Sequence, residues 1–343
     1  MPRMSEVLVG TAKGLFLLDD GLHGPFLRGQ SVYAAAFGQD GRILAGGHDE
    51  HWGPAVLCSD DGGATWTESG AIRFPADVDA AVERVWQVQT APDGVIYAGV
   101  EPAALFASRD GGQTFDLVRG LWDHPHRPQW RPGGGGLCLH TIVPHPTDPA
   151  RMWVAVSTGG VYRTDDGGET WQARNRGIAT SFLPGDEPPE FGQCVHKVTL
   201  HPDHPDRLFL QHHWGVYRSD DAGDSWQSVG ADLPSDFGFP VVVHPDDPMT
   251  FYVIPLESDE FRCTPDGRCR VYRSSDAGGT WEALENGLPQ HDAYVTVLRD
   301  GFCASPSGLY FGTRTGEVFG STDGGERWET LADHLPPVLC VRA

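Results

Sequence analysis

Short apolar runs alternate with tight polar turns along the whole chain. Residues 194–226 illustrate the pattern. Apolar runs lie at 194–200, 207–210 and 216–218, with a His-Pro turn between the first two and a short loop between the last two. A polar turn then leads to Trp226. Runs of this length between Gly, Pro, Asp and Ser residues are typical of β-strands. The pattern predicts units of four strands, here called A to D.

One polar turn returns in unit after unit with the pattern Ser/Thr-x-Asp-x-Gly-x-Thr/Ser-Trp. Phe115 replaces the final Trp once, and Arg327 replaces the Thr once. The aspartate can accept backbone N–H bonds and the glycine tolerates positive φ, so the motif predicts the turn of a hairpin. The copies are residues 59–66, 108–115, 164–171, 219–226, 274–281 and 321–328, with a weaker copy beginning at 18–21.

Self-similarity at this spacing predicts a repeat architecture. The two ends of the chain predict how the repeats close, because residues 6–10 resemble strand B with no strand A before them, and residues 338–342 resemble strand A with no strand B after them. Pairing the last strand with the first unit would remove an open sheet edge. We therefore expect one all-β domain over residues 1–343, a seven-bladed β-propeller closed by the C-terminal strand. Six blades with an extra hairpin is the alternative.

The repeated turn resembles the Asp box of the BNR-repeat propellers, which include sialidases and xyloglucanase-type proteins. The resemblance covers residues 6–343, and it also extends to uncharacterised bacterial proteins described as glycosyl-hydrolase-like. It implies the propeller fold with Asp-box turns. In that family the Asp boxes are structural turns away from the active face, so the resemblance implies little about activity.

The predicted connections are unequal on the two faces of the ring. The A–B turns and the Asp boxes share one face and are short, whereas the opposite face carries the D–A and B–C connections. Long loops on one face of a rigid scaffold commonly hold a binding site. The long connections are residues 68–82, 121–137, 177–193 and 257–270.

The amino-acid composition indicates which kinds of partner and which compartment to expect. The formal net charge of −22 argues against nucleic acid and against anionic membranes as partners. No long apolar run predicts a membrane span, and the chain enters a strand at residues 7–9 without an apolar leader, so we expect a cytoplasmic protein. In that compartment the cysteines are expected to be thiols, and a bond between Cys263 and Cys269 across their turn is disfavoured.

Histidine is abundant, with 15 residues. His145, His201 and His244 precede Pro in A–B turns and are expected to be structural. His140 and His196 occupy equivalent places on strand A of neighbouring units, and His51 and His213 share a His-Trp-Gly ending in B–C loops. Because the A strands line the channel, these last two pairs are expected at the loop-rich mouth.

We hypothesise that His140, His196, His213 and His51 bind a divalent transition metal, most plausibly Zn²⁺, and that Glu101 and Glu257 are the catalytic carboxylates. Such a site would serve a metal-assisted hydrolase or lyase acting on a small molecule at the channel mouth. The competing interpretation is that these histidines hydrogen-bond to loops and line a wet channel. No nucleotide cofactor is expected, because the Gly-rich stretch 133–136 lacks the Lys and Ser/Thr of a P-loop.

Two other functions remain open. A glycoside hydrolase is implied by the resemblance, although residues 72–75 are only a scrambled form of the sialidase Phe-Arg-Ile-Pro motif and no arginine triad can be assigned. A non-catalytic binding propeller is the second. Candidate ligand-binding side chains on the loop-rich face are Trp52, Trp86, Trp122, Trp130 and Trp214 for stacking, and Arg84, Arg127, Arg131 and Arg314 for a carboxylate.

Overall fold

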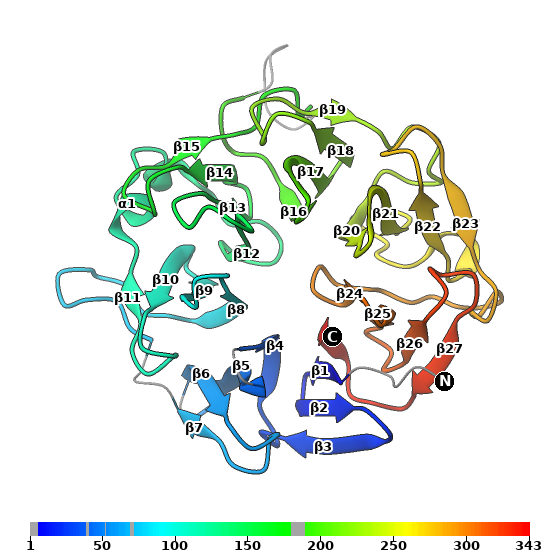
Figure 1. Cartoon of the computed structure of the whole chain (residues 1–343), viewed down its shortest axis with the longest axis horizontal. Coiled ribbons are helices and arrows are strands. Elements are labelled where there is room, and N and C mark those ends of the chain that lie inside the picture. The colour runs from blue at the N-terminus through cyan, green and yellow to red at the C-terminus, as the bar shows by residue number, and fades with distance from the viewer. Residues whose placement is uncertain (1–5, 39–40, 52, 69–71, 180–188) are drawn as a thin grey trace.

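Seven antiparallel sheets of four strands surround a central axis in the computed structural model (Figure 1). The structure describes residues 6–38, 41–51, 53–68, 72–179 and 189–343. Within these residues, helix is confined to the short segments α1 (Arg119–Trp122), η2 (Arg127–Gln129) and η3 (Pro265–Gly267). The prediction of an all-β, seven-bladed propeller is confirmed.

Each blade runs from an innermost strand at the channel to a short outer strand. The innermost strands are β28 (Val338–Arg342), β4 (Ser31–Phe37), β8 (Arg84–Thr90), β12 (Leu139–Pro144), β16 (Val195–His201), β20 (Gly238–His244) and β24 (Phe302–Ser305). The second strands are β1 (Val7–Thr11), β5 (Ile43–Asp49), β9 (Ile96–Glu101), β13 (Met152–Val156), β17 (His204–His212), β21 (Asp247–Pro255) and β25 (Gly308–Gly312). The third strands are β2 (Gly14–Leu18), β6 (Gly53–Ser59), β10 (Ala104–Ser108), β14 (Gly160–Thr164), β18 (Gly215–Ser219), β22 (Val271–Ser274) and β26 (Val318–Ser321). The outer strands are β3 (Leu22–Phe26), β7 (Thr67–Glu68), β11 (Asp116–Leu117), β15 (Gln172–Ala173), β19 (Gln227–Ser228), β23 (Glu282–Leu284) and β27 (Glu329–Ala332).

The hydrophobic core lies between neighbouring blades. Both faces of the second and third strands are covered, so that β1 and β2 are buried along their whole length while the outer β3 is mostly exposed. Phe209 of β17 and Phe251 of β21 stack across one such interface with ring centroids 4.0 Å apart. Because each blade buries its faces only against its neighbours, the ring must close to leave no blade half exposed.

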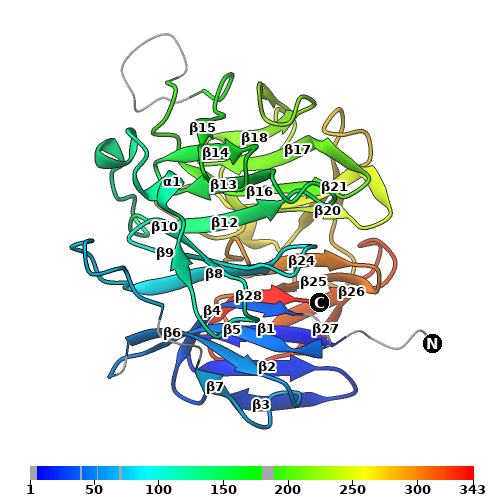
Figure 2. The ribbon, with the colours of Figure 1, turned by 60° about the vertical axis from the view of Figure 1, so that its left-hand side comes forward.

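The C-terminal strand closes the ring as the sequence predicts. β28 pairs antiparallel with β1, with Val341 opposite Val9, and both side chains are fully buried. The red β28 therefore lies beside the blue β1 in both ribbon views (Figures 1 and 2). The backbone N–H of Ala12 also donates to the carbonyl of Pro337 at 3.0 Å, which extends the seam beyond the strand.

The Asp boxes form the expected turns. In the copy at residues 164–171, Asp166 accepts hydrogen bonds from the backbone N–H of Thr170 at 2.9 Å and from its hydroxyl at 2.6 Å, and Thr164 Oγ1 donates to it at 2.8 Å. The indole of Trp171 donates to the Gly168 carbonyl at 3.1 Å and is buried beneath the turn. The same bonds recur in other copies, and those from Thr114 lower the pKa of Asp110 to about 2.

Deleting residues 337–343 should remove the only partner that β1 has on its inner side and expose a buried strand edge. We expect a lower melting temperature and self-association, measured by thermal denaturation and size-exclusion chromatography. Deleting Ala343 alone is the matched control, because β28 ends at Arg342. A truncated chain that stays monomeric and melts like the full chain would contradict the role assigned to β28.

Replacing Asp166 with Ala should lower the free energy of unfolding by about 1–3 kcal/mol, because two donors of Thr170 lose their acceptor. Denaturant unfolding measures the change. Glu169→Ala, in the same turn and exposed, should alter stability little. Equal unfolding curves for the two variants would show that the aspartate does not hold the turn.

Candidate functional site

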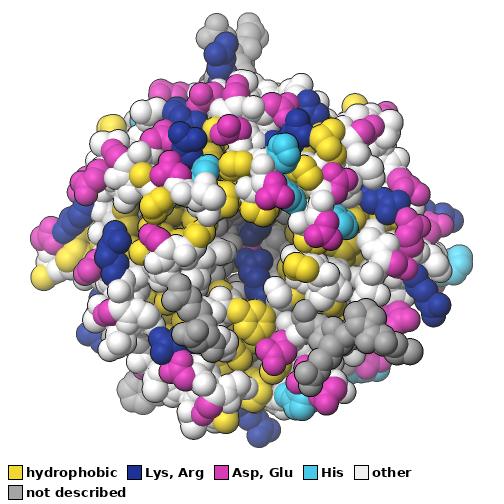
Figure 3. Space-filling model, in the orientation of Figure 1, with side chains coloured by type: hydrophobic (Ala, Val, Ile, Leu, Met, Phe, Trp, Pro, Cys, Tyr) yellow, Lys and Arg dark blue, Asp and Glu magenta, His cyan; other side chains and the backbone are white. Residues whose placement is uncertain are grey.

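A cavity of 530 Å³ opens at the loop-rich mouth of the channel. Its walls come from innermost strands and from D–A and B–C loops of most blades. The lining residues are Tyr33, Arg84, Trp86, Glu101, Gly133, Gly134, Gly135, Gly136, Ser157, Cys194, His196, His213, Phe237, Phe239, Arg262, Leu298, Arg299 and Arg314. The opposite mouth is a separate hollow of 570 Å³, with Lys197 and Arg342 among its lining and His201 and His244 from the A–B turns. Figure 3 shows one face of the molecule with a central hollow. Basic side chains lie deep in this hollow and histidines lie on part of its rim, as is expected for the mouth lined by Lys197, Arg342, His201 and His244.

A β-bulge recurs in the innermost strands, and three of its residues, Tyr33, Trp86 and His196, line the first cavity. In five of the innermost strands the pairing with the second strand skips one residue near the loop-rich end, and a bulge of this kind redirects the skipped side chain. The skipped residues are Tyr33 in β4, Trp86 in β8, His140 in β12, His196 in β16 and Leu339 in β28. The predicted equivalence of His140 and His196 therefore holds in the strand register.

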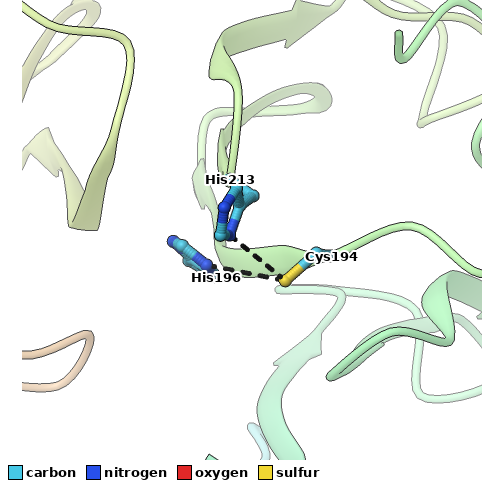
Figure 4. Close-up of side chains that lie close together, drawn as sticks. All are labelled: Cys194, His196 and His213. Atoms are coloured by element: carbon cyan, nitrogen blue, oxygen red, sulfur yellow. Dashed lines mark hydrogen bonds between the residues drawn. The ribbon is translucent and has the colours of Figure 1, made fainter. Parts of the chain in front are cut away.

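Two of the four predicted metal ligands, His196 and His213, come together with a third side chain, Cys194. The Sγ of Cys194 lies 3.7 Å from His196 Nε2 and 3.7 Å from His213 Nδ1 (Figure 4). The three ligand atoms lie within 4.8 Å of one another. Cys194 precedes β16, His196 is its bulged residue and His213 lies between β17 and β18, so one blade supplies the whole group.

The other two predicted ligands are not in this group. His140 is fully buried, with Nδ1 3.0 Å from the hydroxyl of its neighbour Thr141, and it does not reach the cavity surface. His51 is exposed in the turn between β5 and β6, where its backbone N–H donates to Asp49.

Glu101 and Glu257 also occupy different places. Glu101 lines the cavity and accepts hydrogen bonds from Trp86 Nε1 at 3.1 Å and from Arg84 at 3.3 Å. The carboxylate packs against Gly136, whose φ of +94° and lack of a side chain allow this close approach. Glu257 is exposed and is not among the lining residues.

The buried histidines are neutral. Burial, reinforced by the positive charge of Arg299, lowers the pKa of His140 and of His196 well below the usual value. Burial also raises the pKa of the Cys194 thiol, although Arg299 opposes that shift. Neutral imidazole is the form of histidine that binds metals.

Arginine and aromatic side chains alternate around the cavity. The guanidinium carbon of Arg84 lies 4.8 Å from the centroid of Tyr33 and 5.0 Å from that of Trp86. Arg299 follows at 5.2 Å from Trp86 and 5.8 Å from Phe239, and Arg262 lies 5.7 Å from Phe239. These distances are those of cation–π contacts, which hold the guanidinium groups in place without neutralising them.

The described lining carries four arginines, Arg84, Arg262, Arg299 and Arg314, and one carboxylate, Glu101. Arg84 pairs with Glu101, but within the described part of the chain Arg299 forms no ion pair with a carboxylate. The Nε atoms of both Arg84 and Arg299 are buried and have no hydrogen-bond partner among the described residues. The cavity thus carries an excess of positive charge inside an acidic protein.

A buried ion cluster separates the two mouths. Asp300 is 6% exposed and lies 2.6 Å from Lys197 Nζ and 2.8 Å from an Arg342 nitrogen. Burial alone would raise the pKa of Asp300, but Lys197 and Arg342 outweigh it and hold the pKa below its ordinary value. The cluster links β16, β28 and the loop that carries Arg299, so it fixes the floor of the cavity.

Several candidates from the sequence have other roles. Arg127 lies over the ring of Trp122 at 3.2 Å, and Trp130 is buried and donates to the hydroxyl of Tyr162. Trp52 lies outside the described residues. All seven cysteines are free, and no helix in the described part of the chain is long and apolar enough to cross a membrane.

Three residues of the site were not predicted from the sequence: Cys194, Arg262 and Arg299. The spacing Cys194-x-His196 was a usable signal, because residues two apart in an extended chain face the same side. No comparable signal marks the two arginines, since each lies in a loop whose path is set by packing.

Comparison with known proteins supports the repeat assignment. The model of the BNR/Asp-box repeat matches residues 162–173, which include one complete Asp box of this seven-bladed propeller. The xyloglucanase Xgh74A of Acetivibrio thermocellus is 24% identical over 69% of this chain, and a xyloglucanase of Paenibacillus sp. is 24% identical over 58% of it. The aligned regions cover only 30% and 21% of those two proteins.

Solved structures share the fold. An ancestral GH74 enzyme superposes with a TM-score of 0.61 at 18% identity, covering 96% of this chain and 40% of that enzyme. YCF48 bound to D1 peptide superposes with a TM-score of 0.58 at 14% identity, covering 96% of this chain and 86% of YCF48. At such identities the likeness concerns the fold alone.

Replacing Asp300 with Asn should lower the free energy of unfolding by about 3–5 kcal/mol, because Lys197 and Arg342 would remain buried without their counter-charge. Chemical denaturation measures this loss. Adding Lys197→Met to the same chain should restore part of the stability, since one of the two unpaired charges is then removed. Unchanged stability in Asp300→Asn would contradict a structural role for the cluster.

Proposed function

We propose that this chain is a carbohydrate-active propeller, related in function to glycoside hydrolases, whose cavity binds an acidic sugar. The observation that carries the proposal is the set of four arginines interleaved with aromatic rings in one cavity of 530 Å³. The curated relatives are xyloglucanases, which makes a carbohydrate the favoured class of ligand.

The chemistry of the lining selects an acidic sugar. Aromatic rings such as Trp86 and Tyr33 provide flat apolar surfaces against which a sugar ring can pack. Guanidinium groups bind a carboxylate through two parallel hydrogen bonds, and Arg299 lies in the lining without a carboxylate partner among the described residues. A neutral glycan would leave these groups uncompensated, which is costly in a partly enclosed site.

The lining bears on catalysis as well. Glycoside hydrolysis by the common route requires two carboxyl groups on either side of the scissile bond. Among the described lining residues Glu101 is the one carboxylate, and it already accepts bonds from Arg84 and Trp86. This observation favours, as a second candidate, a propeller that binds the acidic sugar without cleaving it.

Isothermal titration calorimetry with glucuronate and galacturonate oligosaccharides, beside neutral xyloglucan oligosaccharides of equal length, tests the proposal. We expect binding of the acidic sugars and at least about tenfold weaker binding in Arg299→Gln, because a charge-assisted pair is lost. Arg109→Gln, exposed in an Asp-box turn at the opposite face, is the matched control and should bind normally.

The two candidate functions separate in a second measurement. Release of reducing ends from a bound acidic oligosaccharide would establish hydrolysis, and binding without release would favour the non-catalytic candidate. Equal affinity for neutral and acidic sugars, unchanged in Arg299→Gln, would overturn the assignment of the cavity.

A further inference from the structure

Beside the arginines of the cavity lies a cysteine–histidine group whose side chains face one another. Cys194, His196 and His213 all line the cavity, and Figure 4 shows both rings directed at the sulfur. A backbone hydrogen bond of 3.0 Å from His213 N to Cys194 O ties the two ends of the group together. The positions of the three side chains are therefore fixed by one blade.

Each histidine is oriented by a partner on its far nitrogen. His196 Nδ1 lies 2.5 Å from the carbonyl oxygen of Gly238, which can only accept, so this nitrogen carries the proton and donates. His213 Nε2 lies 3.2 Å from a carboxylate oxygen of Asp259, so it donates too. When each ring carries only this one proton, His196 Nε2 and His213 Nδ1 direct lone pairs toward Cys194.

The protons in the group do not satisfy its acceptors. A thiol has one proton, and it can be donated to one of the two facing nitrogens, so the other lone pair meets no hydrogen. A metal ion resolves the conflict, because two imidazole lone pairs and a thiolate are then all ligands. Histidine ligands of metals typically donate their second N–H to a carbonyl or carboxylate, as His196 and His213 do here.

The spacing also fits a metal. A tetrahedral zinc site with Zn–S near 2.3 Å and Zn–N near 2.0–2.1 Å places sulfur and nitrogen roughly 3.6 Å apart. Both sulfur–nitrogen separations in this group are 3.7 Å. This distance is long for a hydrogen bond from a thiol to nitrogen and close to the sulfur–nitrogen distance in a tetrahedral zinc site. Modest movement of the two rings toward each other would complete three ligand directions.

We propose that Cys194, His196 and His213 form a site for Zn²⁺ or a similar divalent transition ion, with the fourth position open to the cavity. On binding, the thiol proton passes to the buffer and the thiolate coordinates the ion. Arg299 disfavours a further cation in this region, but the thiolate and Asp259 supply two negative charges beside it. The site does not depend on the proposed function, because its three protein ligands can hold the ion without a sugar.

Metal content of the full chain, purified without a histidine tag under reducing conditions, tests the proposal. After chelation and dialysis against Zn²⁺, we expect one tightly held equivalent, lost in Cys194→Ser and in His213→Asn. Co²⁺ in place of Zn²⁺ should give a thiolate-to-metal charge-transfer band that disappears in Cys194→Ser. Asp259→Asn should weaken the affinity for Zn²⁺ by about 10–100-fold, because it orients His213.

Controls separate this site from others. Cys58→Ser and His201→Gln keep the composition comparable but lie outside the cavity lining, so both should retain the metal and the band. The exposed group Asp19, Asp20 and His23 has no sulfur and cannot give the band. Absence of retained Zn²⁺, or a Co²⁺ band that persists in Cys194→Ser, would overturn the proposal. Acidic sugars are also titrated into zinc-loaded and metal-stripped protein. Failure of the metal site and failure of the sugar site are then seen in separate measurements.

Discussion

The pairing of β28 with β1 is the interaction on which the rest of this structure depends. A blade buries its strands against the blades on either side, so an unclosed ring would expose two faces and one sheet edge. The last strand joins the first blade through buried residues such as Val341 and Val9. Arg342 continues the same strand into the ion pair with Asp300, so closure also positions the charged cluster under the cavity.

Closure brings the innermost strands together around one axis, and the repeated bulge gives five of them a side chain at an equivalent position in the strand register. The fold thus supplies equivalent positions, and the sequence chooses what occupies them: Tyr33 and Trp86 in two neighbouring blades, and His140 and His196 in the next two. Because His140 is covered and His196 is at the cavity surface, equivalence in register does not ensure equivalence in access.

This division explains what could be predicted from the sequence. The blades and their turns were predictable because each Asp box, such as the one around Asp166, specifies its hydrogen bonds within eight residues. His196 and His213 were predictable because they lie on or next to regular strands. Arg299 was not, because its role depends on how a D–A loop folds over the mouth. Cys194 was missed although its spacing from His196 was a usable signal, because its apolar sequence context is typical of a core thiol. The placement of Trp130 against Tyr162 likewise depends on loop packing.

The charge at the axis is opposite to that of the whole molecule, and this contrast constrains any ligand. Arg299, Lys197 and Arg342 surround a single buried carboxylate, Asp300, in a chain whose formal net charge is −22. Burying excess positive charge is unfavourable unless a counter-ion accompanies it. The described lining of the cavity does not supply this counter-ion, because its one carboxylate, Glu101, already pairs with Arg84. An anionic ligand bound beside Arg299 would offset the excess, and an ion held by Cys194 and the two histidines would share the same anion as its fourth ligand. The two proposed sites are therefore compatible in one cavity, because the anion that neutralises the arginines also suits the open position of the metal.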